Sequence, residues 1–211
     1  MSQSNENTDS TYYADENKLG ISDKNEINRL EAKGFINAYI FIGELEIEQI
    51  SLDIYLLLEI HQIVFENLYD WAGKFREHEV TVGAINLTPF PKIREEMYRL
   101  CEDVNAHIAY CIQLKEDQLE EESLKLLADA HHRFVCIHPF TNGNGRMGRI
   151  FINLIAVKLN LNFFELYDEK LEKKDENYSK KTYIQALRAY DRGEREFFIE
   201  LLRQEYQPFS F

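Results

Sequence analysis

Apolar residues recur at helical spacing in the first part of the chain. A first run begins after Ser22 or Asp23, either of which can cap a helix. Its apolar positions are separated by 3, 5, 4 and 3 residues, close to one helical face, with Gly34 as a weak point. They are Ile27, Leu30, Phe35, Tyr39 and Ile42. A second predicted helix is capped by Ser51 and ends before Gly73. Its apolar face is Leu57, Ile60, Val64 and Leu68.

The pattern changes between residues 79 and 90. Here apolar and polar residues alternate on two short arms that flank Gly83 and Ala84, which indicates a small β-hairpin. The alternating apolar residues are Val80, Val82, Ile85 and Leu87. Pro91 then suits the first turn of another helix, because proline needs no backbone N–H there. The predicted core face of that helix is Ile93, Met97, Leu100, Val104, Ile108 and Cys111.

The second half of the chain is predicted to be helical. Segment 146–159 is apolar on most sides and should form the buried central helix. The other predicted helices span residues 117–137, 178–191 and 194–206. Residues 1–20 are polar and lack an apolar period, so we expect a flexible arm followed by a single domain over residues 21–211. The predicted fold class is all-α, a helical bundle with one small β-hairpin.

The stretch between two of these helices, residues 138–149, reads HPFTNGNGRMGR. Gly143 and Gly145 lack a Cβ, so backbone N–H groups can converge there on an anion. If Arg146 opens the next helix, the positive end of that helix faces the same anion. Arg146 and Arg149 lie about one turn apart and could both reach one polyphosphate. The stretch therefore predicts a phosphate-binding loop with His138 beside it as a base.

The composition narrows the functional classes. With 211 residues, 45% of them hydrophobic, the chain suits one domain with a substantial core. Its formal net charge of −13 argues against a nucleic-acid partner, because affinity for a polyanion comes from Lys and Arg. The three cysteines show no C-x-x-C pairing, and neither a secretory signal nor an apolar run of about 20 residues is apparent. We expect a soluble cytoplasmic protein that binds neither nucleic acid nor a membrane.

Residues 138–149 resemble the Fic motif, HxFx[DE]GNGRxxR. Seven of its eight fixed positions match, namely His138, Phe140, Gly143, Asn144, Gly145, Arg146 and Arg149. The departure is Asn142, where most family members have Asp or Glu. Residues 65–76, FENLYDWAGKFR, resemble the tract before the family's target-binding hairpin. The form of the motif, HPFxNGNGR with HHRFV just before it, is similar to that of a branch called mobile mystery protein B. The resemblance covers roughly residues 20–165 and implies a Fic-type helical bundle with the hairpin as a flap.

The resemblance implies a protein adenylyltransferase, which transfers AMP from ATP to a Tyr, Ser or Thr hydroxyl of a target protein and releases pyrophosphate. His138 is the expected general base, since an imidazole can be neutral at cell pH and accept the hydroxyl proton. Binding of ATP is expected to involve Phe140, Thr141, Gly143, Asn144, Gly145, Arg146 and Arg149.

Asn142 is the expected contact for Mg²⁺. A carboxylate there would help to hold the ion between the α- and β-phosphates, whereas a neutral amide oxygen should bind it more weakly. Two alternatives follow: a nucleotide-binding Fic scaffold with weak or no transfer, or transfer of another nucleotide, a phosphoryl or a phosphocholine group. Gly145 argues against the kinase-like relatives, which carry a bulkier, basic residue there. The spacing of His131, His132 and His138 matches no common zinc site, which favours helix packing for the first two.

Two kinds of protein partner are expected from the resemblance. In the family the hairpin pairs with an extended segment of the target, so residues 79–90 are predicted to bind the target by strand addition. Many members are restrained by a helix that carries [ST]xxxE[GN]. Residues 2–7, SQSNEN, fit this string but lie in an unpatterned polar arm. We therefore favour an inhibitory antitoxin protein, as in the toxin–antitoxin pairs of this family.

Overall fold

The chain folds mainly into helices. The computed structural model describes residues 17–46, 51–82, 87–164, 166 and 180–206. The helices of these residues are α1 (Lys24–Gly43), α2 (Ile54–Phe65), α3 (Ile93–Cys111), α4 (Glu116–Ile137), α5 (Asn144–Lys158), α7 (Lys180–Asp191) and α8 (Glu196–Arg203), and a 3₁₀ turn, η2 (Phe90–Lys92), precedes α3. No β-strand runs through the described residues, and the predicted mainly helical class is confirmed.

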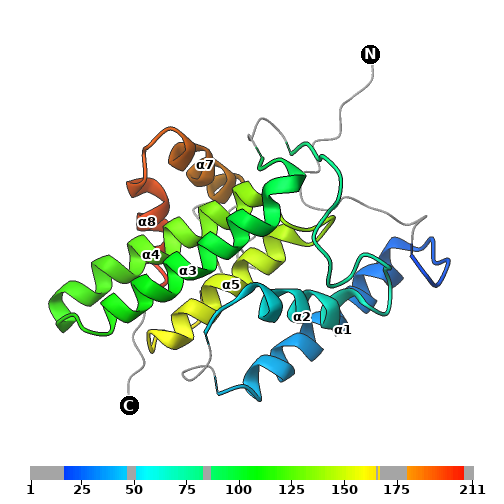
Figure 1. The fold of residues 1–211 in the computed structure, drawn as a ribbon, viewed down its shortest axis with the longest axis horizontal. Coiled ribbons are helices and arrows are strands. Elements are labelled where there is room, and N and C mark those ends of the chain that lie inside the picture. The colour runs from blue at the N-terminus through cyan, green and yellow to red at the C-terminus, as the bar shows by residue number, and fades with distance from the viewer. Residues whose placement is uncertain (1–16, 47–50, 83–86, 165, 167–179, 207–211) are drawn as a thin grey trace.

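Helix α5 is the centre of the arrangement. Figure 1 shows α3, α4 and α5 side by side, with the pair α1 and α2 at one end and the pair α7 and α8 against α4. Helix α5 contacts α2, α3 and α4, and it is buried on most sides. Its buried apolar residues include Met147, Ile150, Phe151, Ile152, Leu154 and Ile155. The predicted central helix is therefore confirmed, although it begins at Asn144 and not at Arg146.

Helix α1 packs on α2 through a close backbone contact. The predicted cap at its start is confirmed, because the Asp23 side chain accepts a hydrogen bond from the N–H of Asn25. Gly34, expected to be a weak point, is the residue at which the two helices touch. A Cβ at this position would lie 2.0 Å from the carbonyl oxygen of Val64. The glycine is therefore required by the helix crossing, which fixes α1 at a short distance from α2.

The start of α2 differs from the prediction. Asp53, and not Ser51, is the N-cap: its Oδ1 accepts hydrogen bonds from the N–H groups of Tyr55 and Leu56, at 2.9 and 2.8 Å. Leu52 is fully buried, and its N–H donates to the side chain of Asn105 on α3. The chain is therefore tied to α3 before it turns into α2, and the carboxylate nearest the first free amides becomes the cap.

The predicted hairpin is not confirmed. Residues 79–82 and 87–89 are in no strand, and residues 83–86, where the turn was expected, lie outside the described residues. The predicted arm falls mostly on residues 1–16, which also lie outside them. Asn17 belongs to the folded part, because it is buried and its side chain bonds the backbone of Ile21. Helix α8 is shorter than predicted, since it ends at Arg203.

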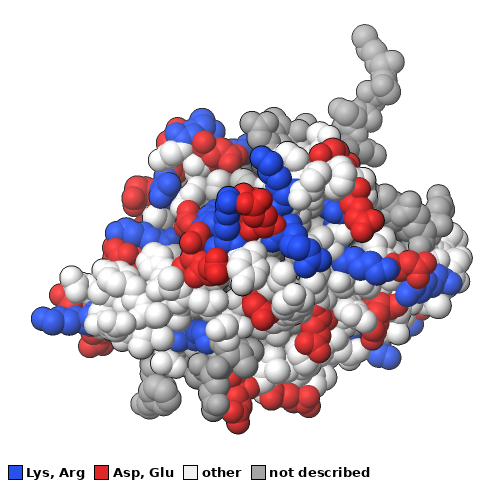
Figure 2. Space-filling model, in the orientation of Figure 1, with Lys and Arg blue, Asp and Glu red and all other residues white. Residues whose placement is uncertain are grey.

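Charged side chains of both signs are distributed among uncharged ones on the face shown in Figure 2, where Lys and Arg are interspersed with Asp and Glu. Among the described residues, several charged side chains are paired: Arg133 of α4 lies 2.9 Å from Asp103 of α3, and Arg203 of α8 lies 2.6 Å from Glu121 of α4. Their charges offset one another locally. None of the helices in the described residues combines the length and apolar character needed to cross a bilayer.

Candidate functional site

The loop at residues 138–143 joins the end of α4 to the start of α5, and its first residue reverses the chain. His138 is the C-cap of α4 and adopts a left-handed conformation, with φ 50° and ψ 60°. Its N–H still donates to the carbonyl of Phe134, at 2.9 Å. A left-handed conformation is uncommon for a residue with a side chain and is often found at functional sites.

One ring nitrogen of His138 is engaged by the helix that precedes it. Nδ1 lies 3.3 Å from the carbonyl oxygen of Val135, which can only accept a hydrogen bond, so Nδ1 carries the proton. In the neutral ring the lone pair then belongs to Nε2. The side chain is half-buried. The geometry therefore suits Nε2 as a proton acceptor, which is the role predicted for this residue.

The middle of the loop is fixed by the side chain of Asn144. Its Oδ1 accepts from the N–H of Phe140, at 2.8 Å, and its Nδ2 donates to the carbonyl of the same residue, at 2.7 Å. The Phe140 ring is fully buried and stacks on His61 of α2, with centroids 3.8 Å apart and planes 6° apart. Asn144 and Phe140 therefore hold the shape of the loop with their side chains, and their predicted contacts with a nucleotide stay a prediction.

Gly143 is the turn into α5. It has φ 79°, and a Cβ at this position would lie 2.6 Å from Cζ of Phe65. The first intrahelical bond of α5 runs from Met147 N–H to Gly143 C=O, and no described side chain caps the helix. The earlier amides at the start of α5 therefore have no partner within the helix, and the positive dipole end of α5 favours an anion there.

Asn142, the predicted metal contact, is buried in the loop. Its Oδ1 accepts the N–H of Gly143, at 2.6 Å, and its backbone carbonyl lies 3.2 Å from Nε2 of His61. The side-chain oxygen that Mg²⁺ would need is thus directed at the loop backbone. As placed, this neutral oxygen fits poorly as a ligand for Mg²⁺, which prefers carboxylates. The predicted metal contact stays a prediction that requires this side chain to turn.

The two motif arginines have different surroundings. Nη1 of Arg146 lies 2.6 Å from Oε2 of Glu31 on α1, whose other oxygen accepts the Tyr69 hydroxyl at 2.9 Å. The guanidinium also lies over the rings of Phe35 and Phe65, at 5.0 and 5.3 Å from their centroids. A phosphate bound by Arg146 would therefore compete with Glu31 for the positive charge of the guanidinium.

Arg149 lies one turn further along α5 and is half-buried. Burial raises the pKa of Tyr39 on α1, and the positive charge of Arg149 partly offsets this rise. The charge of Arg149 is therefore felt on the α1 side of the loop. Thr141 and Gly145 are half-exposed, and their predicted roles stay predictions.

Arg76 is a buried residue of the site that was not predicted. Its Nε donates to the carbonyl of His138 at 2.7 Å, and its Nη1 and Nη2 donate to the carbonyls of His78 and Thr88 at 2.8 and 2.6 Å. Its backbone N–H donates to Pro139, at 2.9 Å. One guanidinium thus connects the first residue of the loop with His78, just before the stretch predicted as a hairpin, and with Thr88 near the end of that stretch. Burial lowers the pKa of Arg76. The only sequence signal was its place at the end of the FENLYDWAGKFR tract.

His61 is a second unpredicted residue of the site. Its Nδ1 accepts the N–H of Gly73 at 3.0 Å, so Nε2 carries the proton and donates to the carbonyl of Asn142. The imidazole therefore links α2, the turn after it and the loop while remaining neutral. Burial lowers the pKa of His61 to about 3. A histidine one residue after Ile60, on an apolar helix face, carries no local signal for such a link.

This burial makes the stability depend on pH. The folded pKa of His61 lies below the unfolded value, so the unfolded chain binds the proton first, and stability is lost as the pH falls below about 6.5. For this histidine we expect a loss of about 2 kcal/mol between pH 7 and pH 5. Urea unfolding of wild type and His61→Gln at both pH values measures it. Between pH 7 and pH 5 the variant should lose about 2 kcal/mol less than the wild type. Equal losses in the two proteins would contradict a low pKa for the buried His61.

The chain is similar in sequence to known proteins. The family model described as Fic/DOC family matches residues 51–156. The chain is 29% identical over 140 residues to protein adenylyltransferase fic-1 of Caenorhabditis elegans, which covers 65% of this chain and 25% of that protein. It is 26% identical over 141 residues to a probable protein adenylyltransferase Fic of Salmonella typhimurium. This match covers 67% of this chain and 66% of that protein. The matched region thus spans a quarter of the Caenorhabditis elegans protein and about two thirds of the Salmonella typhimurium protein.

Solved structures share the fold. The BepC protein of Bartonella tribocorum, solved with bound AMPPNP, is similar with a TM-score of 0.67 and 19% identity, covering 92% of this chain and 93% of that one. An N-terminal Fic domain from Bartonella quintana with bound ADP has a TM-score of 0.69 and 20% identity, covering 93% and 94%. Together with the family model, which spans half of the sequence, these findings show that the chain belongs to the Fic/DOC family.

Proposed function

We propose that the chain is a protein adenylyltransferase that transfers AMP from ATP to a Tyr, Ser or Thr hydroxyl of a target protein. The observation that carries the proposal is the pairing of two features in one loop. The Nδ1 contact of His138 with Val135 leaves Nε2 as the basic nitrogen, and the start of α5, which no described side chain caps, follows six residues later. A base beside an anion site is what attack of a hydroxyl on a phosphate requires. The names of the curated relatives support the same activity.

The proposed step uses the chain's own groups. The target hydroxyl gives its proton to Nε2 of His138 as its oxygen attacks the α-phosphorus of ATP. A new oxygen–phosphorus bond forms, the bond to the bridging oxygen breaks, and pyrophosphate leaves with the electron pair. Backbone amides at the start of α5 stabilise the negative charge on the phosphates, and the loop positions the reacting atoms. Because Asn142 fits poorly as a ligand for Mg²⁺, no step depends on a metal held by the protein.

The target segment is proposed to bind along residues 79–82 and 87–89. These residues lie next to the base, because the same Arg76 side chain bonds the carbonyls of His138 and Thr88. The N–H of Thr88 also donates to the carbonyl of Cys136 on α4, at 3.0 Å. An extended peptide could therefore add its backbone here and present a hydroxyl to His138. An inhibitory antitoxin protein stays a proposal from the family resemblance, and residues 2–7 lie outside the described residues.

The test is transfer of label from ATP to proteins of a cell lysate. We expect at least one labelled protein, with an added mass of one AMP and a labelled Tyr, Ser or Thr side chain. His107→Ala is the matched control, because it removes an imidazole of α3 whose Nε2 lies 3.6 Å from Glu122, away from the loop. It should label the same proteins. Failure of labelling with every nucleotide of a panel would overturn the proposal, and a different added mass would identify another transferred group.

The alternative of a nucleotide-binding scaffold rests on Asn142. Asn142→Asp keeps the size of the side chain and the acceptor for Gly143 N–H while adding the negative charge that a divalent cation prefers. For an active transferase we expect this variant to raise the rate of transfer by roughly tenfold. Initial rates of labelling with Mg²⁺ and ATP measure the effect. Tight ATP binding without wild-type transfer, together with transfer by the aspartate variant, would favour the scaffold.

A further inference from the structure

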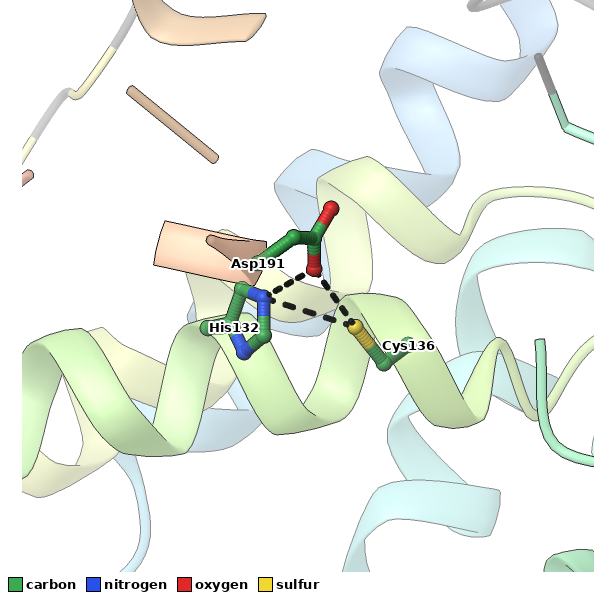
Figure 3. A group of neighbouring side chains, drawn as sticks. All are labelled: His132, Cys136 and Asp191. Atoms are coloured by element: carbon green, nitrogen blue, oxygen red, sulfur yellow. Dashed lines mark hydrogen bonds and ion pairs between the residues drawn. The ribbon is translucent and has the colours of Figure 1, made fainter. Parts of the chain in front are cut away.

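A group of three different side chains lies at the junction of α4 and α7. His132 and Cys136 are four residues apart on α4, so they share one helix face, and Asp191 is the last residue of α7. Figure 3 shows the three side chains directed toward one another. Nε2 of His132 lies 2.7 Å from Oδ1 of Asp191 and 3.6 Å from Sγ of Cys136, and Sγ lies 3.9 Å from the same Oδ1.

The contacts differ from those of a cysteine–histidine–aspartate catalytic triad. In such a triad one ring nitrogen faces the nucleophile, and the other faces the carboxylate that orients the ring. Here Asp191 and Cys136 both approach the same nitrogen, Nε2 of His132. The three donor atoms therefore converge on one region of space. Convergence of a nitrogen, a sulfur and an oxygen is the arrangement of metal ligands and not of a proton relay.

The distances suit a small tetrahedral ion. Bond lengths of about 2.0 to 2.3 Å to zinc place tetrahedral ligand atoms about 3.3 to 3.6 Å apart. The two distances that involve Sγ of Cys136, 3.6 and 3.9 Å, are close to this range. The distance of 2.7 Å between His132 and Asp191 has to open by about 0.6 Å. A small rotation of Asp191 achieves this, since its side chain is 37% exposed.

The surroundings hold the histidine and leave one side open. The ring of His132 packs against that of Tyr190, with centroids 4.4 Å apart, and its side chain is 16% exposed. The exposure of Asp191 gives solvent access to the site, so water can complete a set of four ligands. A thiol and an imidazole disfavour Mg²⁺ and Ca²⁺, which prefer oxygen, and favour zinc and its neighbours in the first transition row.

We propose that His132, Cys136 and Asp191 bind a divalent late transition-metal ion, of which Zn²⁺ is the one to test, with water as the fourth ligand. On binding, the Cys136 thiol releases its proton to solvent and its sulfur bonds the ion as a thiolate, with no change of oxidation state. Burial raises the pKa of the Cys136 thiol to about 12, and the negative charge of Asp191 adds to this effect, so the proton is present at neutral pH until the ion displaces it.

The ion would join two parts of the fold that are distant in sequence. Cys136 precedes His138 by two residues, and its carbonyl accepts the N–H of Thr88. Asp191 belongs to the α7–α8 pair that packs on α4. The bound ion would therefore fasten the C-terminal helices to the turn of α4 that leads into the functional loop. A structural rather than catalytic role follows, and it does not depend on the proposed transfer activity.

Titration of the purified full chain with Zn²⁺, without nucleotide, tests the proposal. We expect one ion per chain and, at a hundredfold excess over Kd, an increase in Tm of about 5 to 10 °C. Co²⁺ should give the near-ultraviolet charge-transfer band of a thiolate ligand. Cys136→Ser and Asp191→Asn should each weaken Zn²⁺ binding, the serine variant by at least about 100-fold. Cys111→Ala, which changes a cysteine of α3 outside the group, should bind as the wild type does.

Circular dichroism in the presence of a chelator measures whether each variant folds without metal. Each variant should match the helix content of the wild type without metal, so that a loss of binding reports a lost ligand. Three results would overturn the proposal: no binding of Zn²⁺ to the wild-type chain, a Co²⁺ complex without the thiolate band, or a folded Cys136→Ser variant that binds Zn²⁺ as tightly as the wild type.

Discussion

Replacement of His138 by alanine is expected to reduce AMP transfer by about 10²- to 10⁴-fold, because the ring nitrogen proposed to accept the hydroxyl proton is removed. Binding of ATP should stay close to the wild-type value, because the amides at the start of α5 are unchanged. Initial rates of labelling give the first quantity, and calorimetric titration with ATP gives the second. The structure thus predicts a loss in kcat with little change in affinity.

The conformation of His138 suggests a second variant as a control. Alanine is unfavourable in a left-handed conformation, so part of its effect could come from a change in the loop. Asparagine tolerates that conformation and offers no base, so His138→Asn should show the same loss of transfer with an intact loop. Retention of more than about a tenth of the wild-type rate in the asparagine variant would contradict the role of His138 as base.

Replacement of Arg76 by methionine is expected to lower the free energy of unfolding by about 3 to 5 kcal/mol. The guanidinium is fully buried and donates to the carbonyls of His138, His78 and Thr88. Methionine fills a similar volume but leaves these acceptors without their donor, which is more costly than the loss of a surface ion pair. Urea unfolding at pH 7 measures the change.

Arg99→Met is the matched control for Arg76. Arg99 is an exposed residue of α3 that pairs with Glu95 and Glu96, so its loss should cost less than about 1 kcal/mol. Arg76→Met should also lower kcat for transfer by about 10²-fold, because a base displaced by about 1 Å is poorly placed for the hydroxyl. Equal stability of the two variants would show that Arg76 does not hold the loop.

The sequence predicted the features that depend on neighbouring residues. Apolar residues every three or four positions place most of the helices, because one helix face must be buried wherever the helix packs. The same reasoning identified residues 146–159 as the central helix, since apolar residues on most sides leave no face for water. The His138 to Arg149 motif likewise depends on short spacings, so the sequence alone is enough to indicate the family.

Features that depend on long-range contacts could not be predicted. Arg146 pairs with Glu31, 115 residues away, and His132 lies beside Asp191, 59 residues away. No periodicity relates such positions, because their meeting depends on how whole helices pack. The hairpin prediction at residues 79–90 is unconfirmed for a related reason. The carbonyl of Thr88 within that stretch and that of His78 just before it bond the Arg76 side chain, a partner that alternation of apolar residues does not reveal.

The contact of Arg146 with Glu31 has a consequence for the energetics of ligand binding. An anion that recruits this guanidinium competes with a carboxylate that is 8% exposed and shares its other oxygen with Tyr69. The affinity of the loop for a nucleotide therefore includes the cost of weakening a partly desolvated ion pair. Glu31 belongs to α1, outside the residues 51–156 that the family model matches. The N-terminal helix thus takes part in setting the occupancy of the loop, and a fragment limited to the matched residues would lack this internal competitor.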